Sequence, residues 1–258
     1  MIQRRENLDD FLAVVESLFD EGRLERARAE LGRAREIFPE SAVLLEWEAV
    51  FASDQGRFLE ALEHLNGVLE KEPERRFALR EKSSVLLELG RFEDCLEILQ
   101  KLGPDGPRDA SYYYNLGSCD DRIGRAGEAD GHFARAAAIN PRDCRIPPRL
   151  SRKIFEKIIQ RALSGLPTTV GELMARAHIV IEDYPGPCDY DPFLLALYSP
   201  APRYRQQRPS ADTVTYLTLF KRNIEMEFPD TEKMSEEILR MVVREVSLRH
   251  GLEMELEE

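Results

Sequence analysis

The chain has 258 residues, 43% of them apolar and 33% charged, and a formal net charge of -12. This composition is typical of a folded protein long enough for two domains, and it excludes large-scale disorder. The acidic charge excludes a general affinity for nucleic acid or for an anionic membrane, because both require a basic surface. No apolar run approaches the roughly 18 residues of a spanning helix, and no apolar signal core begins the chain, so we expect a cytoplasmic protein without a membrane partner.

A regular pattern occupies residues 1–143. Gly-Arg recurs every 34 residues, and a proline follows 17 residues after each glycine: Gly22, Gly56, Gly90 and Gly124, then Pro39, Pro73, Pro107 and Pro141. Between them stand a small residue and, four positions later, a large apolar one: Ala27, Ala61, Cys95 and Ala129, then Leu31, Leu65, Leu99 and Phe133. The glycine is suited to end one helix, the small residue to let a second helix cross it closely, and the proline to end that second helix.

This 34-residue pattern resembles the tetratricopeptide repeat. The resemblance implies an all-α superhelix of four stacked helical hairpins, which we place at residues 8–41, 42–75, 76–109 and 110–143. Glu48 and Lys82 depart from the family, which prefers an apolar residue there, and Asp120 stands where the family prefers an aromatic one. The segment 103–107 holds two glycines and two prolines, which predicts that the third hairpin ends early.

Stacked first helices of such a superhelix form a groove that holds peptides, so the resemblance implies a protein or peptide partner. The groove-facing positions in the family's register are Leu12, Glu16, Glu46, Val50, Arg80, Ser84, Tyr114 and Ser118. A receptor for chaperone tails is not expected, because Leu12, Glu16 and Trp47 occupy the positions where such receptors have Lys, Asn and Asn. The identity of the partner and the oligomeric state are left open.

The 34-residue register ends after Pro141, and residues 144–258 are predicted to form a separate α+β domain. Apolar positions at helical spacing predict one helix over 149–164 and a closing helix from about 231 to 250. Two runs rich in strand-forming residues, 178–182 and 214–220, predict strands. Between these strands we expect a loop rich in proline and tyrosine, from Tyr184 to Arg208.

The serial order of four short motifs in this half resembles the minimal zincin-like metallopeptidase family of bacteria, over roughly residues 147–255. The motifs are Leu166-Pro167 and the segments 179–185, 195–198 and 215–225. In that family a short sheet supports a C-terminal helix that carries His-Glu-x-x-His, followed by a glycine and a further acidic ligand. The resemblance implies zinc held by two imidazoles one helical turn apart, with the glutamate as general base.

The ligand positions of that motif are degenerate in this chain. Arg244 and Leu248 stand where the two histidines belong, and Met254 stands where the acidic ligand belongs. Glu245 and the turn glycine Gly251 are the parts of the motif that remain. Because a guanidinium cannot donate a lone pair to zinc, and leucine and methionine offer no hard ligand, we expect a pseudoenzyme without metal or other cofactor.

An improvised metal site near the chain end is the alternative. Its candidate ligands are Glu245, His250, Glu253 and Glu255. It has one imidazole, and His250 lies five residues after Glu245, on a different face of the helix. We therefore interpret His250 as a surface histidine at a helix C-terminus.

A local basic cluster is the other candidate site of this half. Its members are Arg203, Arg205, Arg208, Lys221 and Arg222, with Arg244 joining them if the last helix packs on these strands. Such a cluster suits a phosphate or an acidic peptide, while a solvated loop is the plainer interpretation.

Three hypotheses about function follow. The first is a protein–protein interaction scaffold of bacterial type, with a peptide-binding groove in the repeats and a non-catalytic zincin-like domain. The second is a metal-dependent peptidase that the repeats supply with substrate. The third is that residues 144–258 form a capping α+β domain without a zincin relation, and a sheet that does not lie against the last helix would indicate it.

Overall fold

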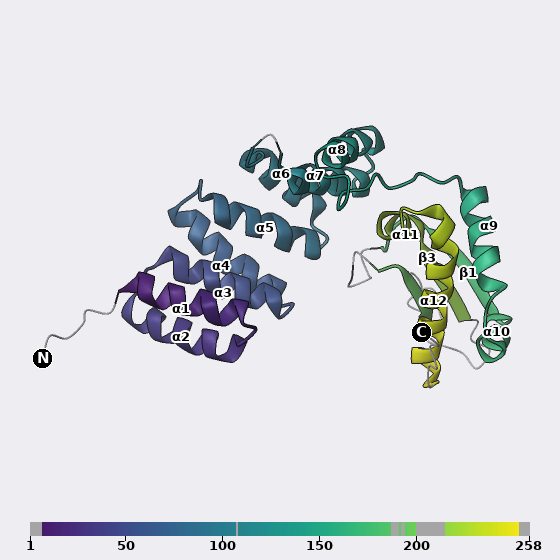
Figure 1. The fold of residues 1–258 in the computed structure, drawn as a ribbon, viewed down its shortest axis with the longest axis horizontal. Helices are drawn as coiled ribbons and strands as arrows, with labels where there is room; N and C mark the ends of the chain where they lie inside the picture. The colour runs from purple at the N-terminus through teal and green to yellow at the C-terminus, as the bar shows by residue number, and fades with distance from the viewer. Residues whose placement is uncertain (1–6, 107, 187–190, 192–193, 200–214, 253–258) are drawn as a thin grey trace, which may run out of the picture. The chain divides into compact units, whose positions relative to one another are not determined.

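The computed structural model describes residues 7–106, 108–186, 191, 194–199 and 215–252 (Figure 1). The chain divides into two compact units, Met1–Pro107 and Arg108–Glu258. The first unit is built of helical hairpins, and the second combines one hairpin with a small α+β domain.

The first unit stacks three antiparallel hairpins, drawn in purple to blue in Figure 1. Its helices are α1 (Leu8–Asp20), α2 (Leu24–Ile37), α3 (Ala42–Asp54), α4 (Phe58–Lys71), α5 (Arg76–Glu88) and α6 (Phe92–Leu102). The first helix of each hairpin begins at the residue that the 34-residue pattern predicts.

The glycines of the pattern end the first helices in the way that was expected. Gly22, Gly56 and Gly90 have φ of +69°, +69° and +68°, in the left-handed region that favours glycine. The arginine after each glycine donates its backbone N–H back into the last turn, as from Arg23 to the Leu18 carbonyl at 2.8 Å. This bond satisfies a carbonyl that the helix end leaves free, in the arrangement known as the Schellman motif.

The small residues of the pattern are buried. Ala27, Ala61 and Cys95 are fully buried, as are Leu65 and Leu99, and Cys95 Sγ lies 3.2 Å from the Ser83 carbonyl on α5. The third hairpin ends early, as predicted, because α6 stops at Leu102 and Gly103 follows with φ of +63°.

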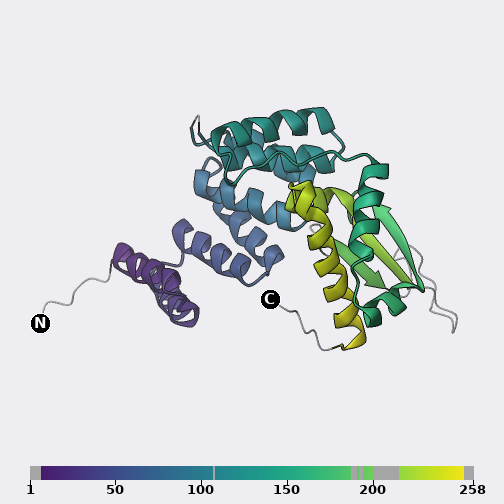
Figure 2. The same ribbon diagram turned by 45° about the vertical axis from the view of Figure 1, so that its right-hand side comes forward.

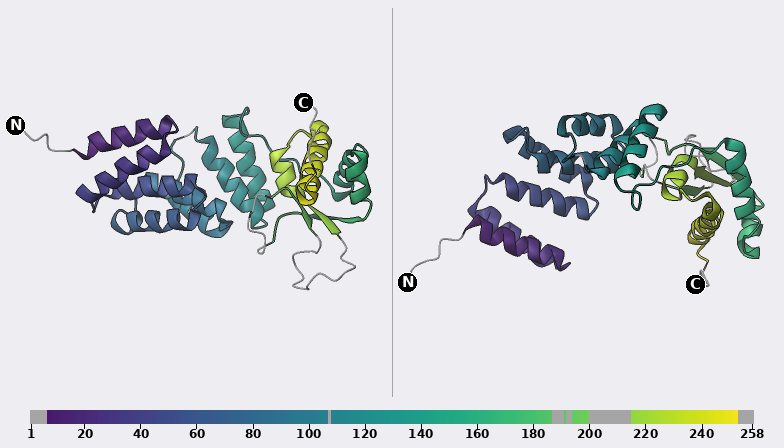
Figure 3. Two further views of the ribbon diagram at one scale, coloured as in Figure 1. Left: turned by 90° about the horizontal axis from the view of Figure 1, so that it is seen from below. Right: turned by 45° about the horizontal axis from the view of Figure 1, so that its top comes forward.

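The second unit begins with the fourth hairpin and continues into the α+β domain. Its elements are α7 (Ala110–Arg122), α8 (Ala126–Ile139), α9 (Arg152–Leu163), α10 (Thr168–Met174), β1 (Ala177–Glu182), β2 (Ala196–Ser199), β3 (Thr215–Phe220), α11 (Lys221–Glu227) and α12 (Thr231–His250). The helices α9 and α12 lie side by side over one face of the sheet (Figures 2 and 3). Their apolar faces and the core face of β3 form one buried cluster, which includes Phe155, Leu217 and Val242.

The sheet has the strand order β1-β3-β2. β1 pairs with β3 in parallel, with Ile179 opposite Leu217, and β2 pairs with β3 in the antiparallel direction, with Ala196 opposite Leu219. The last helix, α12, packs against the sheet. A sheet that did not lie against this helix would have indicated a capping domain without a zincin relation, but the packing does not by itself define the zincin family.

The prediction of a loop over residues 184–208 was wrong at one place, because the strand β2 lies within it. Four residues are too few to show a strand by pattern, and β2 exists because the free edge of β3 satisfies its backbone groups. The short helices α10 and α11 were not predicted either.

The compact units also differ from the domain boundary that we placed after residue 143. The division falls at Pro107, within the glycine- and proline-rich segment, so that α7 and α8 belong with the α+β domain. The 34-residue period runs through this point unchanged, and the glycine- and proline-rich segment predicted only that the third hairpin ends early.

Candidate functional site

A cavity of about 580 Å³ opens on the first helices of the three hairpins in the first unit. It is lined from α1, α3 and α5 by Leu12, Glu16, Phe19, Asp20, Val43, Glu46, Trp47, Val50, Phe77 and Glu81. We call this cavity the acidic groove. Four of the predicted groove positions line it: Leu12, Glu16, Glu46 and Val50.

On α5 the lining residues differ from the predicted pair. Arg80 forms an ion pair with Asp105, in the segment after α6, and Ser84 Oγ donates to the Arg80 carbonyl at 3.4 Å. Phe77 and Glu81 line the groove instead. They lie four residues apart and therefore on one face of α5. This spacing shows that they share a face, but it does not show which face of α5 lines the groove.

Aromatic side chains form one wall of the groove. The ring of Phe19 lies edge-on to Trp47 and to Phe51, with centroid distances of 5.7 and 5.3 Å. Phe77 is 44% exposed, although it is a large apolar side chain. Packed aromatic rings beside an exposed one are typical of a surface that binds another molecule.

Carboxylates form the rest of the polar lining. Glu46 is buried and paired with Arg75, whose Nη2 donates to Oε2 at 2.8 Å. Among the residues that the structure describes, Glu16, Asp20 and Glu81 have no ion-pair partner. Burial raises the pKa of Glu81 above its usual value, Arg80 lowers it, and Glu46 raises it further. The groove therefore carries an excess of negative charge.

The two remaining predicted groove positions, Tyr114 and Ser118, lie on α7 in the second unit. Ser118 is buried, and Tyr114 lies edge-on to Phe133 at 5.1 Å. Burial raises the pKa of the Tyr114 hydroxyl. Neither residue lines the acidic groove.

The segment whose sequence resembles a degenerate zincin motif, called the remnant below, lies at a second cavity of about 400 Å³, between β2 and α12. Arg244 and Glu245 both line it, and burial raises the pKa of Glu245 against the opposing effect of Arg244. Leu248 is 66% exposed, and His250 is exposed at the end of α12. Within the described part of the chain, no three His, Cys, Asp or Glu side chains are placed to hold a metal ion.

The residues at this remnant do not fit a zinc ion. A cationic guanidinium occupies the first ligand position, and an exposed leucine the second. Met254, Glu253 and Glu255 lie outside the described residues, so the improvised site near Glu245 and His250 stays an untested alternative.

The basic cluster that the sequence suggested is not assembled by the described residues. Arg203, Arg205 and Arg208 lie outside them. Arg222 is buried, and Lys221 Nζ pairs with the buried carboxylate of Glu225 at 2.9 Å.

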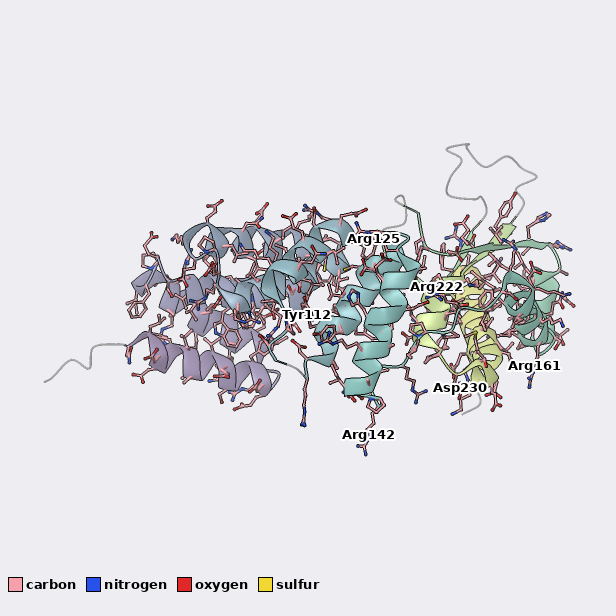
Figure 4. The ribbon with its side chains drawn as sticks, turned by 90° about the horizontal axis from the view of Figure 1, so that it is seen from above. Tyr112, Arg125, Arg142, Arg161, Arg222 and Asp230 are labelled. Atoms are coloured by element: carbon pink, nitrogen blue, oxygen red, sulfur yellow. The ribbon has the colours of Figure 1, made fainter. Side chains whose placement is uncertain are left out.

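Arg222 instead takes part in a buried cluster around Asp121 of α7. Its Nη2 lies 2.7 Å from Asp121 Oδ2, Arg149 Nη2 lies 2.7 Å from Oδ1, and the Tyr184 hydroxyl donates to the same carboxylate. Burial alone would raise the pKa of Asp121, but the hydrogen bonds from Tyr184 and Arg222 hold it below its usual value. Figure 4 shows Arg222 on α11, beside the fourth hairpin.

Stacked helical hairpins with a lined groove on their first helices define a helical-repeat protein. The family model described as the tetratricopeptide repeat matches residues 52–118, from α3 to α7. Residues 52–118 are thus similar to tetratricopeptide repeats. No helix in the described part of the chain is both long and apolar enough to cross a bilayer.

Similar solved structures cover about half of this chain. MamA from Desulfovibrio magneticus RS-1, solved from residue 41 to its end, is 20% identical with a TM-score of 0.48, over 52% of this chain and 76% of that chain. PilF of Pseudomonas aeruginosa is 22% identical with a TM-score of 0.47, over 52% and 61%. YrrB, described as a TPR protein with an unusual peptide-binding site, is 21% identical with a TM-score of 0.48, over 54% and 72%. A search of curated proteins found no match.

Proposed function

We propose that this protein is a protein–protein interaction scaffold whose acidic groove receives a segment of a partner protein. The observation that carries the proposal is the groove itself, where the exposed ring of Phe77, the partly buried rings of Phe19 and Trp47 and carboxylates without an ion-pair partner meet on α1, α3 and α5. Binding sites combine apolar walls with a few polar groups in this way. A cytoplasmic location is part of the proposal.

Site-specific photocrosslinking tests this function. A benzophenone amino acid placed at Phe77, in the groove, is expected to capture a partner in cells that express the full chain. The matched control carries the same group at Leu59 on α4, which is 68% exposed but does not line the groove. Equal capture from both positions would contradict the proposal, because it would indicate a surface without a preferred site.

We also propose that the α+β domain is a zincin-like domain without catalytic activity. The support is chemical, since Arg244 replaces the first metal ligand beside the cavity that Glu245 lines. Elemental analysis of the purified full chain is expected to give far less than one zinc per chain, and casein is expected to stay intact. Near-stoichiometric zinc, lost in Glu245→Ala, together with casein cleavage that a chelator stops, would establish the competing metal-dependent peptidase.

A further inference from the structure

We infer that the acidic groove selects a cationic segment, in which a lysine or arginine is flanked by apolar side chains. The inference rests on the proposed function, because it specifies what the same groove binds. Its basis is the charge and shape of the groove lining.

The charge of the lining is of one sign. Four carboxylates line the groove, and none of the lining residues is a lysine or an arginine. Glu46 is neutralised by Arg75, which approaches from the start of α5. Glu16 and Asp20 lie one helical turn apart on α1. Together with Glu81 they are the three carboxylates left for a partner to neutralise.

Glu81 is the carboxylate that has most to gain from a cation. It is half-buried in the lining, so it has lost part of its water without gaining an ion pair. The neighbouring guanidinium of Arg80 is held by Asp105. A charge-assisted hydrogen bond from a lysine or arginine of the partner would replace the lost solvation.

The aromatic wall suits the rest of such a segment. Trp47 and Phe19 supply packed rings, and Phe77 is partly exposed beside them. Aromatic rings bind both apolar side chains and the stems and charged ends of lysine and arginine. An acidic or phosphorylated segment would instead meet carboxylates with no cation in the lining, and like charges at an interface oppose binding.

Matched peptide libraries test the inference on the full chain. Three sets of end-blocked ten-residue peptides share randomised apolar positions and carry lysine, glutamine or glutamate at the same two fixed positions. Binding is followed by the fluorescence of Trp47, the single tryptophan of the chain, which lies in the groove. We expect lysine peptides to bind about tenfold more tightly than glutamine peptides, glutamate peptides to bind most weakly, and added salt to reduce the difference.

A pair of variants assigns the effect to Glu81. Glu81→Gln is expected to weaken the binding of lysine peptides about fivefold and to leave glutamine peptides unchanged. The matched control is Glu63→Gln, an exposed position on α4 outside the groove lining, which is expected to change neither. Circular dichroism verifies that both variants are folded.

The possible failures are distinguishable. If no library binds and the Trp47 emission does not change, the groove is not a peptide site and the proposed function fails with the inference. If glutamine or glutamate peptides bind as tightly as lysine peptides, or if Glu81→Gln behaves like its control, the groove binds peptides and the selection for cations is refuted.

Discussion

At the residue scale, the packing of neighbouring helices limits the size of the side chain at single positions of the repeats. Gly117 on α7 is the clearest case, because a Cβ placed there would lie 2.8 Å from the ring of Phe133. Phe133 is 1% exposed and therefore cannot move aside into solvent. The close approach of α7 and α8 thus depends on the absence of a side chain at residue 117.

Gly117→Ala is expected to destabilise the protein by about 1–3 kcal/mol, the usual cost of overpacking a filled core. The matched control is Gly131→Ala on α8, where an added Cβ meets nothing within 4 Å. In an exposed helix interior this control is expected to stabilise by about 0.5–1 kcal/mol. Urea unfolding followed by circular dichroism measures both, and a neutral Gly117→Ala would show that the ring of Phe133 yields.

Glu81 is expected to favour peptide binding but to lower the stability of the folded protein. The pKa of Glu81 is raised in the folded protein, so the carboxylate ionises more easily in the unfolded chain. The free energy of unfolding therefore falls as pH rises above about 4.5, where the side chain begins to ionise. Glu81→Gln is therefore expected to raise the free energy of unfolding at pH 7 by up to about 0.5 kcal/mol. The gain should vanish at pH 4, and a loss of stability at pH 7 would contradict this account.

The departures from the repeat pattern also have partners that sequence spacing does not reveal. Asp120 is buried, and its Oδ2 lies 3.0 Å from Nδ1 of His132 on α8. Glu48 lies 3.6 Å from Nδ1 of His64 and 3.8 Å from Nε of Arg35. Asp120 is accommodated because α8 supplies a hydrogen-bonding partner, and Glu48 lies within ion-pair distance of side chains on α2 and α4.

At the element scale, the cluster around Asp121 joins α7 to three other segments of the second unit. Arg149 precedes α9, Tyr184 follows β1, and Arg222 lies on α11. Arg222 also donates to the Pro148 carbonyl at 2.6 Å, and Glu225 accepts the Leu150 N–H at 2.9 Å. One hairpin of the repeat array is thereby anchored to the α+β domain.

Asp121→Asn is expected to lower the free energy of unfolding by about 1.5–3 kcal/mol at pH 7, because the buried guanidinium of Arg222 loses one of its two carboxylate partners and keeps Glu225. The pKa of Asp121 is depressed in the folded protein, so its contribution is present above about pH 3.8 and is lost as pH falls through the folded value. The difference between wild type and variant should therefore shrink toward pH 2.

The control for this prediction is Asp130→Asn, which removes the more exposed partner of the same Arg149. We expect it to cost less than about 1 kcal/mol. Equal losses in the two variants would mean that burial of Asp121 does not strengthen the cluster.

At the scale of the whole molecule, the structure groups the first three hairpins in one unit and the fourth hairpin with the α+β domain in the other. A fragment of residues 108–258 is expected to fold cooperatively. A fragment of residues 144–258 lacks α7, α8 and the hydrogen bonds of Asp121, and is expected to have a lower melting temperature. Thermal unfolding of the two fragments measures the difference. Equal melting temperatures would support the boundary that we placed at residue 143.

The sequence by itself determined the helices of the repeats and the long helices of the second half. These are local features: Gly22 and its equivalents end helices through their own φ, and apolar spacing marks a helix such as Thr231–His250 without reference to distant residues. It also indicated which face of α1 and α3 forms the groove, since Glu16 and Glu46 follow from the repeat register.

Only the tertiary structure decided where the units divide and which charges are free. Arg222 is basic in the sequence but buried beside Asp121, 101 residues away. Glu81, and not the adjacent Arg80, lines the groove, and Arg80 pairs with Asp105. Ion pairing and desolvation depend on groups brought together by folding, and no local pattern in a chain records them.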